Sequence, residues 1–249
     1  TTDANQPITS QPQAAFHPDN LQGFMIYFGT GQYLETTDND PNNQPLQAFY
    51  GIWDKNESIL TAFDSDDLLV QTIDNQYDQE FDTDNDGSLD TTFTLRDVSK
   101  NSINFGTHMG FKLGLIPVLV DGIPNTDNFG ERQISNAIIS NGRIIFTSLQ
   151  PSQVECEFGG SSFLMEIDFR SGGALDFPAF DLNNDGEYDG DDTDASGRAS
   201  DVGIMPTVSL LGDGAQDIAF GSGSGGDIEV INITVGNEAY GRQSWNQLE

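Results

Sequence analysis

Short apolar runs, rich in aromatic and β-branched residues, alternate along the chain with turns made of Gly, Asn, Asp and Pro. Runs with this length, composition and flanking residues are typical of β-strands. The best examples are 23–31, 47–54, 91–98, 142–149, 162–169, 216–223 and 227–235. The pattern therefore predicts a protein built mainly from β-strands.

One segment, 57–72, carries a loosely helical pattern instead. Its apolar residues fall near one face of a helix: Ile59, Leu60, Phe63, Leu68 and Leu69. The polar residues 64–67 interrupt that face. We therefore expect at most a short helix here.

A sequence unit occurs three times, beginning near Ile8, Ile134 and Ile204. In each copy a strand of small residues is followed by a turn and then by a strongly apolar strand that ends in Gly, Thr or Ser. Repeated β-units of this kind are typical of propeller blades, whose inner strand packs closely around the axis. The predicted fold is all-β: about three quinoprotein-like blades of a larger β-propeller, whose other blades would lie outside this sequence.

The charge of the chain narrows the choice of partners. Asp and Glu number 40 against 9 Lys and Arg, which gives a formal net charge of −31. Such a surface cannot supply the basic footprint that nucleic acids and anionic membranes require, so we expect no nucleic acid partner and look for cations instead. The longest apolar run, 114–120, contains Pro117 and is too short to cross a bilayer, so we expect no membrane insertion. A single cysteine, Cys156, cannot form a disulfide within the chain.

Two acidic insertions, near 74–93 and 176–201, carry the most specific chemistry. The second contains a loop, 181–192, with oxygen-bearing residues at alternate positions and Gly186 at the sixth. Ca²⁺ takes six to eight hard oxygen ligands, and a glycine at position six allows the turn that wraps the loop around the ion. The pattern predicts an EF-hand-like calcium loop. Its expected ligands are Asp181, Asn183, Asp185, the carbonyl of Glu187, Asp189 and, at position twelve, Asp192.

The first insertion repeats this pattern between residues 82 and 90, with Gly87 at the sixth position. The expected ligands are Asp82, Asp84, Asp86, the carbonyl of Ser88, and Asp90. Position twelve is Phe93, so another acid, Asp78 or Glu80, would complete the shell. The alternative for both loops is a solvated acidic surface in a salt-adapted protein. A composition bias of that kind would not place glycine at the sixth position twice.

Other motifs are weaker. Gly221, Gly223 and Gly226 match G-x-G-x-x-G, but a strand follows them, so we expect a hairpin turn and no dinucleotide site. His17 and His108 lie far apart in sequence, which makes a zinc site improbable. The two tryptophans, Trp53 and Trp245, are expected to be packing residues, and the stretch 163–175 resembles the turn at the end of a quinoprotein-type blade strand.

Taken together, these segments resemble the C-terminal propeller domain of PilY1/PilC-type proteins, the tip-associated adhesins and biogenesis factors of type IV pili. The resemblance runs in family order over nearly the whole chain. It rests on QPITSQP (6–12), MIYFGTGQYLE (25–35), QAFYGIWD (47–54), GERQISNAIISNGRIIFTSLQP (130–151), CEFGGSSFLMEID (156–168), FDLNNDGEYD (180–189) and GRQSWNQL (241–248).

The resemblance implies that residues 1–249 are the C-terminal portion of a calcium-dependent β-propeller domain. It further implies export through the periplasm and an extracellular location at the pilus tip. The implied partners are minor pilins of the pilus tip complex, a host or abiotic surface, and the upstream part of the same propeller. The family's acidic loop pattern falls on residues 82–90 and 181–189.

The leading hypothesis is therefore a non-enzymatic, calcium-binding propeller module that acts in pilus assembly and surface attachment. The alternative is an extracellular quinoprotein-like or calcium-dependent enzyme on the same scaffold. A third possibility, an integrin-like repeat propeller, is hinted at by the sequence IAFGSGSG (218–225), but its calcium loops would recur at regular blade positions. The two acidic loops do not recur in the third unit, which counts against it.

Overall fold

The computed structural model describes residues 6–41, 45–58, 62–154, 158–212 and 216–236. In this part of the chain, regular structure is almost entirely β, with two short 3₁₀ turns at Thr36–Asn39 and Ser65–Asp67. The strands are β1 (Gln13–Phe16), β2 (Phe24–Gly29), β3 (Ala48–Asp54), β4 (Leu69–Phe81), β5 (Thr91–Val98), β6 (Gly110–Val120), β7 (Ile123–Pro124), β8 (Ile138–Ser140), β9 (Arg143–Pro151), β10 (Gly160–Asp168), β11 (Gly197–Ala199), β12 (Ser209–Gly212), β13 (Asp217–Ser222) and β14 (Ile228–Ile233).

The seven strands predicted from the sequence are confirmed, as β2, β3, β5, β9, β10, β13 and β14. The expectation of at most a short helix within 57–72 agrees with the structure over residues 65–72. Residues 65–67 form a single 3₁₀ turn and Leu69 already begins the long strand β4. Pairing with β5 on one side and β6 on the other overrides the weak helical pattern of this segment.

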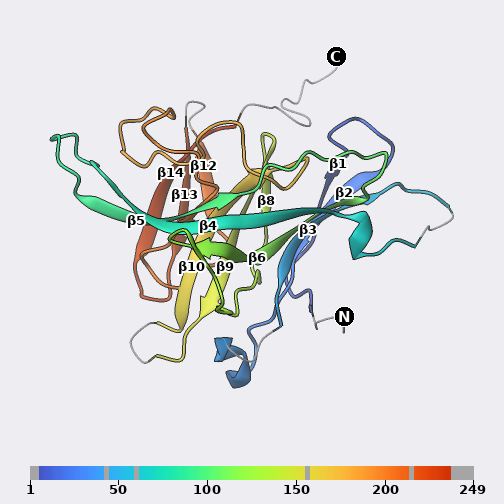
Figure 1. Ribbon diagram of the computed structural model, residues 1–249, viewed down its shortest axis with the longest axis horizontal. Coiled ribbons are helices and arrows are strands. Elements are labelled where there is room, and N and C mark those ends of the chain that lie inside the picture. Colours follow the sequence, from blue (N-terminus) through green and yellow to red (C-terminus); the bar gives the residue numbers. More distant parts are fainter. Residues whose placement is uncertain (1–5, 42–44, 59–61, 155–157, 213–215, 237–249) are drawn as a thin grey trace, which may run out of the picture.

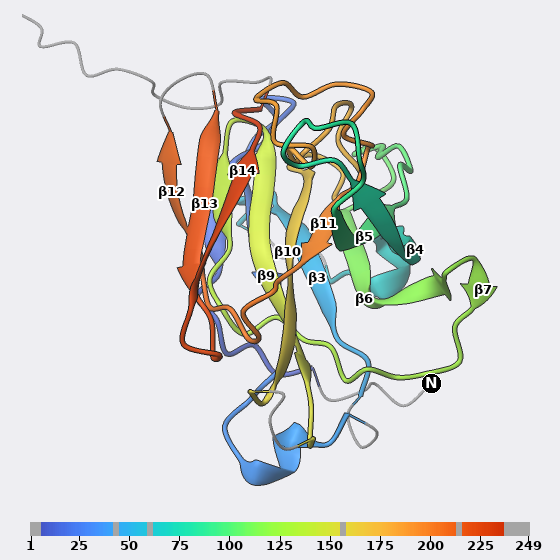
Figure 2. The ribbon, with the colours of Figure 1, turned by 90° about the vertical axis from the view of Figure 1, so that its left-hand side faces the viewer.

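The strands form one long sheet and one short sheet (Figures 1 and 2). The long sheet has the order β1-β2-β3-β6-β4-β5-β11-β10-β9-β8, with β7 paired to β6, and the short one has the order β12-β13-β14. Neighbours are antiparallel except for the parallel pair β4–β6. Because β1 at one end of the long sheet contacts β8 at the other, this sheet is nearly closed into a barrel.

The three repeated units of the sequence appear as three strand pairs, β1–β2, β8–β9 and β12–β13. Residues near the start of each unit contact one another in series: Gln11 N donates to Asn136 Oδ1 at 2.9 Å, and Asn136 N donates to Thr207 Oγ1 at 2.7 Å. The inner ends of the units therefore gather together, as in a propeller. The all-β propeller prediction is confirmed, with one addition: the hairpin β4–β5 joins the sheet β1-β2-β3-β6 to the sheet β11-β10-β9-β8.

Two apolar clusters hold these layers together. The first lies inside the nearly closed sheet, where the rings of Phe49 and Phe146 stack with centroids 4.3 Å apart. The second lies between that sheet and β12–β14, and includes Ile145, Leu164 and Ile231. Strands β9 and β10 stand between the clusters, which explains why their sequences are apolar on both faces. Trp53 is buried in the first cluster, as predicted.

Buried ion pairs cross the joints between the layers. Arg143 on β9 contacts Glu166 on β10 at 3.1 Å and Asp217 on β13 at 2.7 Å, and it also donates to the carbonyl of Thr234. Burial raises the pKa of Glu166 to about 7, which the nearby Arg143 opposes. These contacts attach the three-stranded sheet to the rest of the fold.

In the described part of the chain, no helix has both the length and the apolar character needed to cross a lipid bilayer.

Candidate metal centres

The two acidic loops occupy different places in the fold. The loop 82–90 is the tip of the hairpin β4–β5, which extends away from the body of the molecule (blue-green in Figure 1). The loop 181–192 lies beside the three-stranded sheet, since Phe180 forms an isolated bridge with Ile233 on β14. Neither loop stands between two helices in the described structure, so both are EF-hand-like loops within a β-protein.

In the hairpin loop, Asp82, Asp84 and Asp86 come together. Each brings a carboxylate oxygen within 4.8 Å of the others. The carboxylate of Asp82 accepts hydrogen bonds from Gly87 N at 2.8 Å and from Asp86 N at 3.2 Å, and Asp86 Oδ1 accepts one from Ser88 N at 2.8 Å. The loop is therefore curled around its own acidic groups.

The loop 181–192 repeats this hydrogen bonding position by position. Asp181 Oδ2 accepts from Gly186 N at 3.1 Å, as Asp82 does from Gly87. The third and fifth positions, Asn183 and Asp185, accept from the backbone N–H two residues further on, at 3.1 and 2.8 Å. The backbone conformations match as well, since Asn85 and Asn184 at position four have φ of 58° and 60°, and both glycines at position six have positive φ. The same spacing of residues thus produces the same backbone twice.

Asp181 is the residue of this loop whose surroundings bear most directly on cation binding. It is 9% exposed, and its Oδ1 atom is buried without a hydrogen-bond partner among the described residues. Burial raises the pKa of Asp181, an effect that the N–H group of Gly186 opposes. A buried, unpaired carboxylate oxygen is costly unless a cation or a donor satisfies it. A hard cation in the loop would supply that partner.

Asp192, predicted as the ligand at position twelve, is fully buried, and both of its oxygens meet the backbone of its own loop. Oδ1 accepts from Leu182 N at 2.7 Å and from Asn183 N at 3.3 Å, and Oδ2 accepts from Asp189 N at 3.3 Å. Asp192 therefore holds the two ends of the loop together. This role and the amide at Asn183 explain why the described structure gathers three carboxylates closely in the hairpin loop alone.

The remaining predicted ligands are placed less directly. Asp90 Oδ1 accepts from Thr83 N at 3.2 Å and from the hydroxyls of Thr83 and Thr91, both at 2.8 Å. These bonds, first among them that from Thr91, lower the pKa of Asp90. Asp78, considered as an extra ligand, lies on β4 and accepts from Thr94 Oγ1 at 2.6 Å. The ligand roles of all the predicted residues, Ser88, Glu187 and Asp189 included, stay predictions.

Anchoring of the loop 181–192 was not predicted from the sequence. Leu182, at position two, is buried in the second apolar cluster, and Asn184 Oδ1 accepts from Asn232 Nδ2 at 3.1 Å. Tyr188, at position eight, is half-buried, whereas Leu89 at the same position of the hairpin loop is 64% exposed. The sequence signal for this anchoring was an apolar residue between acidic ones. Both loops contain such a residue, so the signal does not tell them apart. Only the tertiary structure distinguishes an anchored loop from a projecting one.

The weaker motifs have ordinary structural roles in the fold. Gly223 and Gly226 lie in the turn between β13 and β14, where Gly223 N donates to Asp227 O at 2.8 Å, so the G-x-G-x-x-G match is a hairpin turn. His17 packs against the rings of Trp53 and Phe105. Cys156 and Trp245 lie outside the described residues.

Comparison with known proteins finds relatives of this chain. The model of the PilY1 beta-propeller domain matches residues 1–87. The type IV pilus biogenesis factor PilY1 of Pseudomonas aeruginosa strain PAO1 is 27% identical over 257 residues, an alignment that covers 99% of this chain. A type IV pilus biogenesis factor PilY1 homolog of Xylella fastidiosa is 31% identical over 170 residues, covering 68% of this chain and 10% of that protein. The chain is a relative of the PilY1 proteins.

A solved structure has the same fold. The crystal structure of the Pseudomonas aeruginosa PilY1 C-terminal domain superposes with a TM-score of 0.76 and 23% sequence identity, over 95% of this chain and 46% of that one. This likeness shows that the two share a fold. The chain spans about a fifth of the length of the Pseudomonas aeruginosa PilY1, 21% of it. The predicted resemblance to the PilY1 C-terminal propeller domain is confirmed.

Proposed function

We propose that this chain is a calcium-binding propeller module that works in type IV pilus assembly and surface attachment, and that it catalyses no reaction. The assignment to the pilus machinery is supported by the relatives, which are named type IV pilus biogenesis factors. The assignment of calcium is supported chiefly by the buried, unpaired Oδ1 atom of Asp181 in a loop of EF-hand spacing.

The donor set fits Ca²⁺ better than a transition metal. Side chains at the first, third and fifth positions of both loops offer oxygen, and no cysteine or histidine lies in either loop. Hard oxygen ligands favour Ca²⁺ and Mg²⁺, and a flexible loop of carboxylates and carbonyls suits the larger ion. Asp181, Asn183, Asp185 and Asp189 would hold the ion in one loop, and Asp82, Asp84, Asp86 and Asp90 in the other.

The two loops would serve different purposes. The loop 181–192 is tied to β14 through Asn184 and to the core through Leu182, so an ion there would stabilise the joint with the three-stranded sheet. The hairpin loop is exposed and projects from the body, so an ion there would order only the tip of the hairpin. Calcium would thus act on global stability at one site and on local order at the other.

Partners follow from the same proposal. The outward face of the three-stranded sheet exposes Leu211, Phe220, Ile228 and Val230, on the side opposite the second apolar cluster. We propose that the upstream part of the same propeller covers this face, and that the assembled protein is exported through the periplasm and displayed with minor pilins at the pilus tip. There it would contact a host or abiotic surface.

Thermal unfolding with and without calcium tests the metal part of this proposal. A dissociation constant of about 10⁻⁴ M, at the tight end for extracellular sites, would stabilise the fold by about 2.7 kcal/mol at 10 mM calcium. Asp185→Ala should abolish this gain. Asp191→Ala is the matched control, because Asp191 lies in the same loop with the same charge but outside the predicted ligands.

Asp82→Ala should leave the calcium-dependent melting temperature unchanged and should remove calcium protection of the hairpin tip against proteolysis. If chelator changes neither the melting temperature nor the proteolysis of the wild-type protein, the calcium assignment is wrong.

A further inference from the structure

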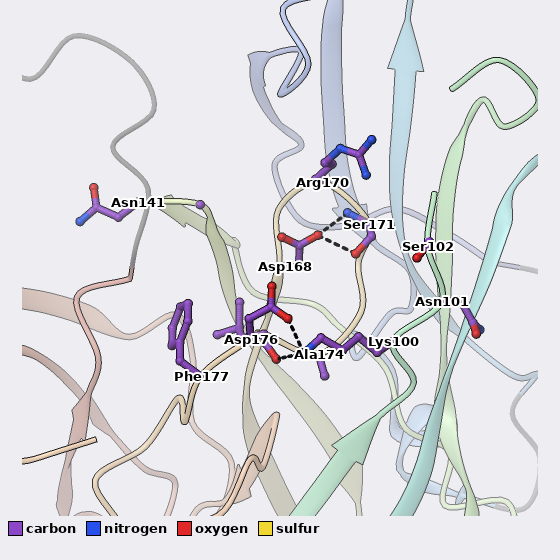
Figure 3. A pocket seen from close by; sticks show the side chains of 12 residues that line it. Lys100, Asn101, Ser102, Asn141, Asp168, Arg170, Ser171, Ala174, Asp176 and Phe177 are labelled. Atoms are coloured by element: carbon purple, nitrogen blue, oxygen red, sulfur yellow. Dashed lines mark hydrogen bonds and ion pairs between the residues drawn. The ribbon is translucent and has the colours of Figure 1, made fainter. Parts of the chain in front are cut away.

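A polar cavity lies apart from both acidic loops. It has a volume of about 430 Å³ and is lined by three segments: the residues after β5, the turn between β8 and β9, and the turn that follows β10 (Figure 3). Small-molecule sites commonly occupy clefts of about 300–1,000 Å³. The cavity is therefore large enough for a small ligand.

Asp168 lines this cavity and lies between Arg170 and Asp176 in the view of Figure 3. Its Oδ1 atom accepts the backbone N–H of Ser171 at 2.6 Å and also the Ser171 hydroxyl. Figure 3 shows the other carboxylate oxygen turned away from Ser171. The turn itself is held by Gly172 N donating to Asp168 O at 2.8 Å and by Asp168 N donating to Gly173 O at 2.8 Å. The acceptor is thus held in place before any ligand arrives, which lowers the entropic cost of binding.

The charges that line the cavity cancel. Lys100 Nζ contacts Asp176 at 2.6 Å, and Arg170 contacts Asp19, just outside the lining, at 2.7 Å. The lining therefore carries two cationic side chains, Lys100 and Arg170, and two carboxylates, Asp168 and Asp176. Because Asp176 and Asp19 already neutralise the two cationic side chains, the cavity selects against strongly anionic ligands.

The uncharged groups of the lining add both donors and acceptors. Ser102 contributes a hydroxyl, and Asn101 and Asn141 contribute amide groups whose nitrogens also donate to the carbonyls of Val70 and Val235, both at 2.9 Å. Phe177 contributes a half-buried aromatic side chain. A saccharide has the complementary chemistry, because its hydroxyls both donate and accept hydrogen bonds while its ring C–H groups present an apolar face. We propose that this cavity binds a neutral saccharide of one or two rings, with Asp168 accepting hydrogen bonds from its hydroxyls.

The test uses the full chain with four free sugars as probes: glucose, galactose, mannose and N-acetylglucosamine. Binding is measured by ligand-observed NMR and calorimetry. At least one sugar should bind with a dissociation constant of the order of 1 mM, the affinity expected for a ligand of this size. In Asp168→Asn the side-chain oxygen can still accept from Ser171, and the other carboxylate oxygen is replaced by an NH₂ group. This variant should therefore weaken sugar binding by about tenfold or more. Asp66→Asn, the same charge change on an exposed turn, should leave binding unchanged.

A second variant, Ser102→Trp, fills the cavity from an exposed position and should abolish binding without disturbing the core. Asp185→Ala should bind sugar as the wild type does, which separates this inference from the calcium proposal. If none of the four sugars binds below 20 mM, or if Asp168→Asn and Ser102→Trp bind as tightly as the wild type, the inference is wrong. Binding of arginine or inorganic phosphate at this cavity in place of a sugar would also overturn it.

Discussion

The buried ion pair between Arg96 and Glu131 gives the sharpest test of what holds this fold together. Arg96 Nη1 and Nη2 donate to the two carboxylate oxygens of Glu131 at 2.6 and 2.7 Å, and both side chains are 0% exposed. Gln76 accepts from Nε and Nη2 of Arg96, Gln150 donates to Glu131, and the ring of Phe163 lies 3.4 Å from Arg96 Cζ. The pair therefore ties β4 and β5 to β9 and β10.

We predict that Glu131→Gln lowers the free energy of unfolding by about 3–5 kcal/mol, because it leaves the Arg96 guanidinium buried without a countercharge. Arg96→Met should cost a similar amount, since it leaves the Glu131 carboxylate alone. The double variant should cost clearly less than the sum, with a coupling energy of about 2 kcal/mol or more. A domain usually has about 5–15 kcal/mol of stability, so a loss of this size is a large fraction of the total and is readily measured.

The pair formed by Lys100 and Asp176 is the matched control. Its N–O distance is also 2.6 Å, but its side chains are 55% and 88% exposed. Because water screens an exposed pair, Asp176→Asn should change the stability by less than about 1 kcal/mol.

Equilibrium urea unfolding, followed by tryptophan fluorescence at constant calcium, measures all four variants. If Glu131→Gln costs no more than Asp176→Asn, burial does not decide the strength of these pairs and the reasoning fails.

Two further predictions concern a buried acid and a close contact. Burial raises the pKa of Glu166 from its ordinary 4.5 to about 7. Between these pH values the folded protein keeps the proton on the Glu166 carboxyl, whereas the unfolded chain has lost it. The stability that this proton contributes therefore falls as the pH rises from about 4.5 to 7. Glu166→Gln has no such proton, so its stability relative to the wild type should rise across this window by at most about 1.4 kcal/mol per pH unit in urea titrations; a difference independent of pH would contradict this. Gly51→Ala should destabilise the fold by about 1–3 kcal/mol, because a Cβ atom there would lie 2.3 Å from the ring of Phe111. An unchanged melting temperature for Gly51→Ala would show that the ring moves aside freely.

The sequence alone was sufficient wherever local pattern and spacing decide the outcome. The seven predicted strands form because alternating or continuous apolar runs have one face or both faces to bury, as β9 shows. The repeated units appear as three equivalent strand pairs. The two acidic loops adopt the same backbone because alternate oxygen side chains, and a glycine at position six, satisfy the same backbone N–H groups in each.

Strands β4 and β6 escaped prediction because β4–β6 and β3–β6 pair segments that are distant in sequence, although β4 also forms a hairpin with β5. The segment of β6 contains Gly114 and Pro117, which locally argue against a strand. Pro117 is nonetheless accommodated opposite Ile73, beside a register shift in β4, and beyond the last residue of β6 that pairs with β3. Pairing on both sides stabilises a strand that local propensity would not.

The tertiary structure also decided what the charges do. Composition shows an acidic chain with few basic residues, but it cannot show that Arg96, Arg132 and Arg143 are fully buried at the joints between strands. Nor can the spacing of the residues show that both carboxylate oxygens of Asp192 accept hydrogen bonds from the backbone of its own loop, while one oxygen of Asp181 has no partner among the described residues. Ligand spacing is a local property that the order of residues carries. Burial and the supply of partners depend on segments far apart in the sequence, and only the folded arrangement brings them together.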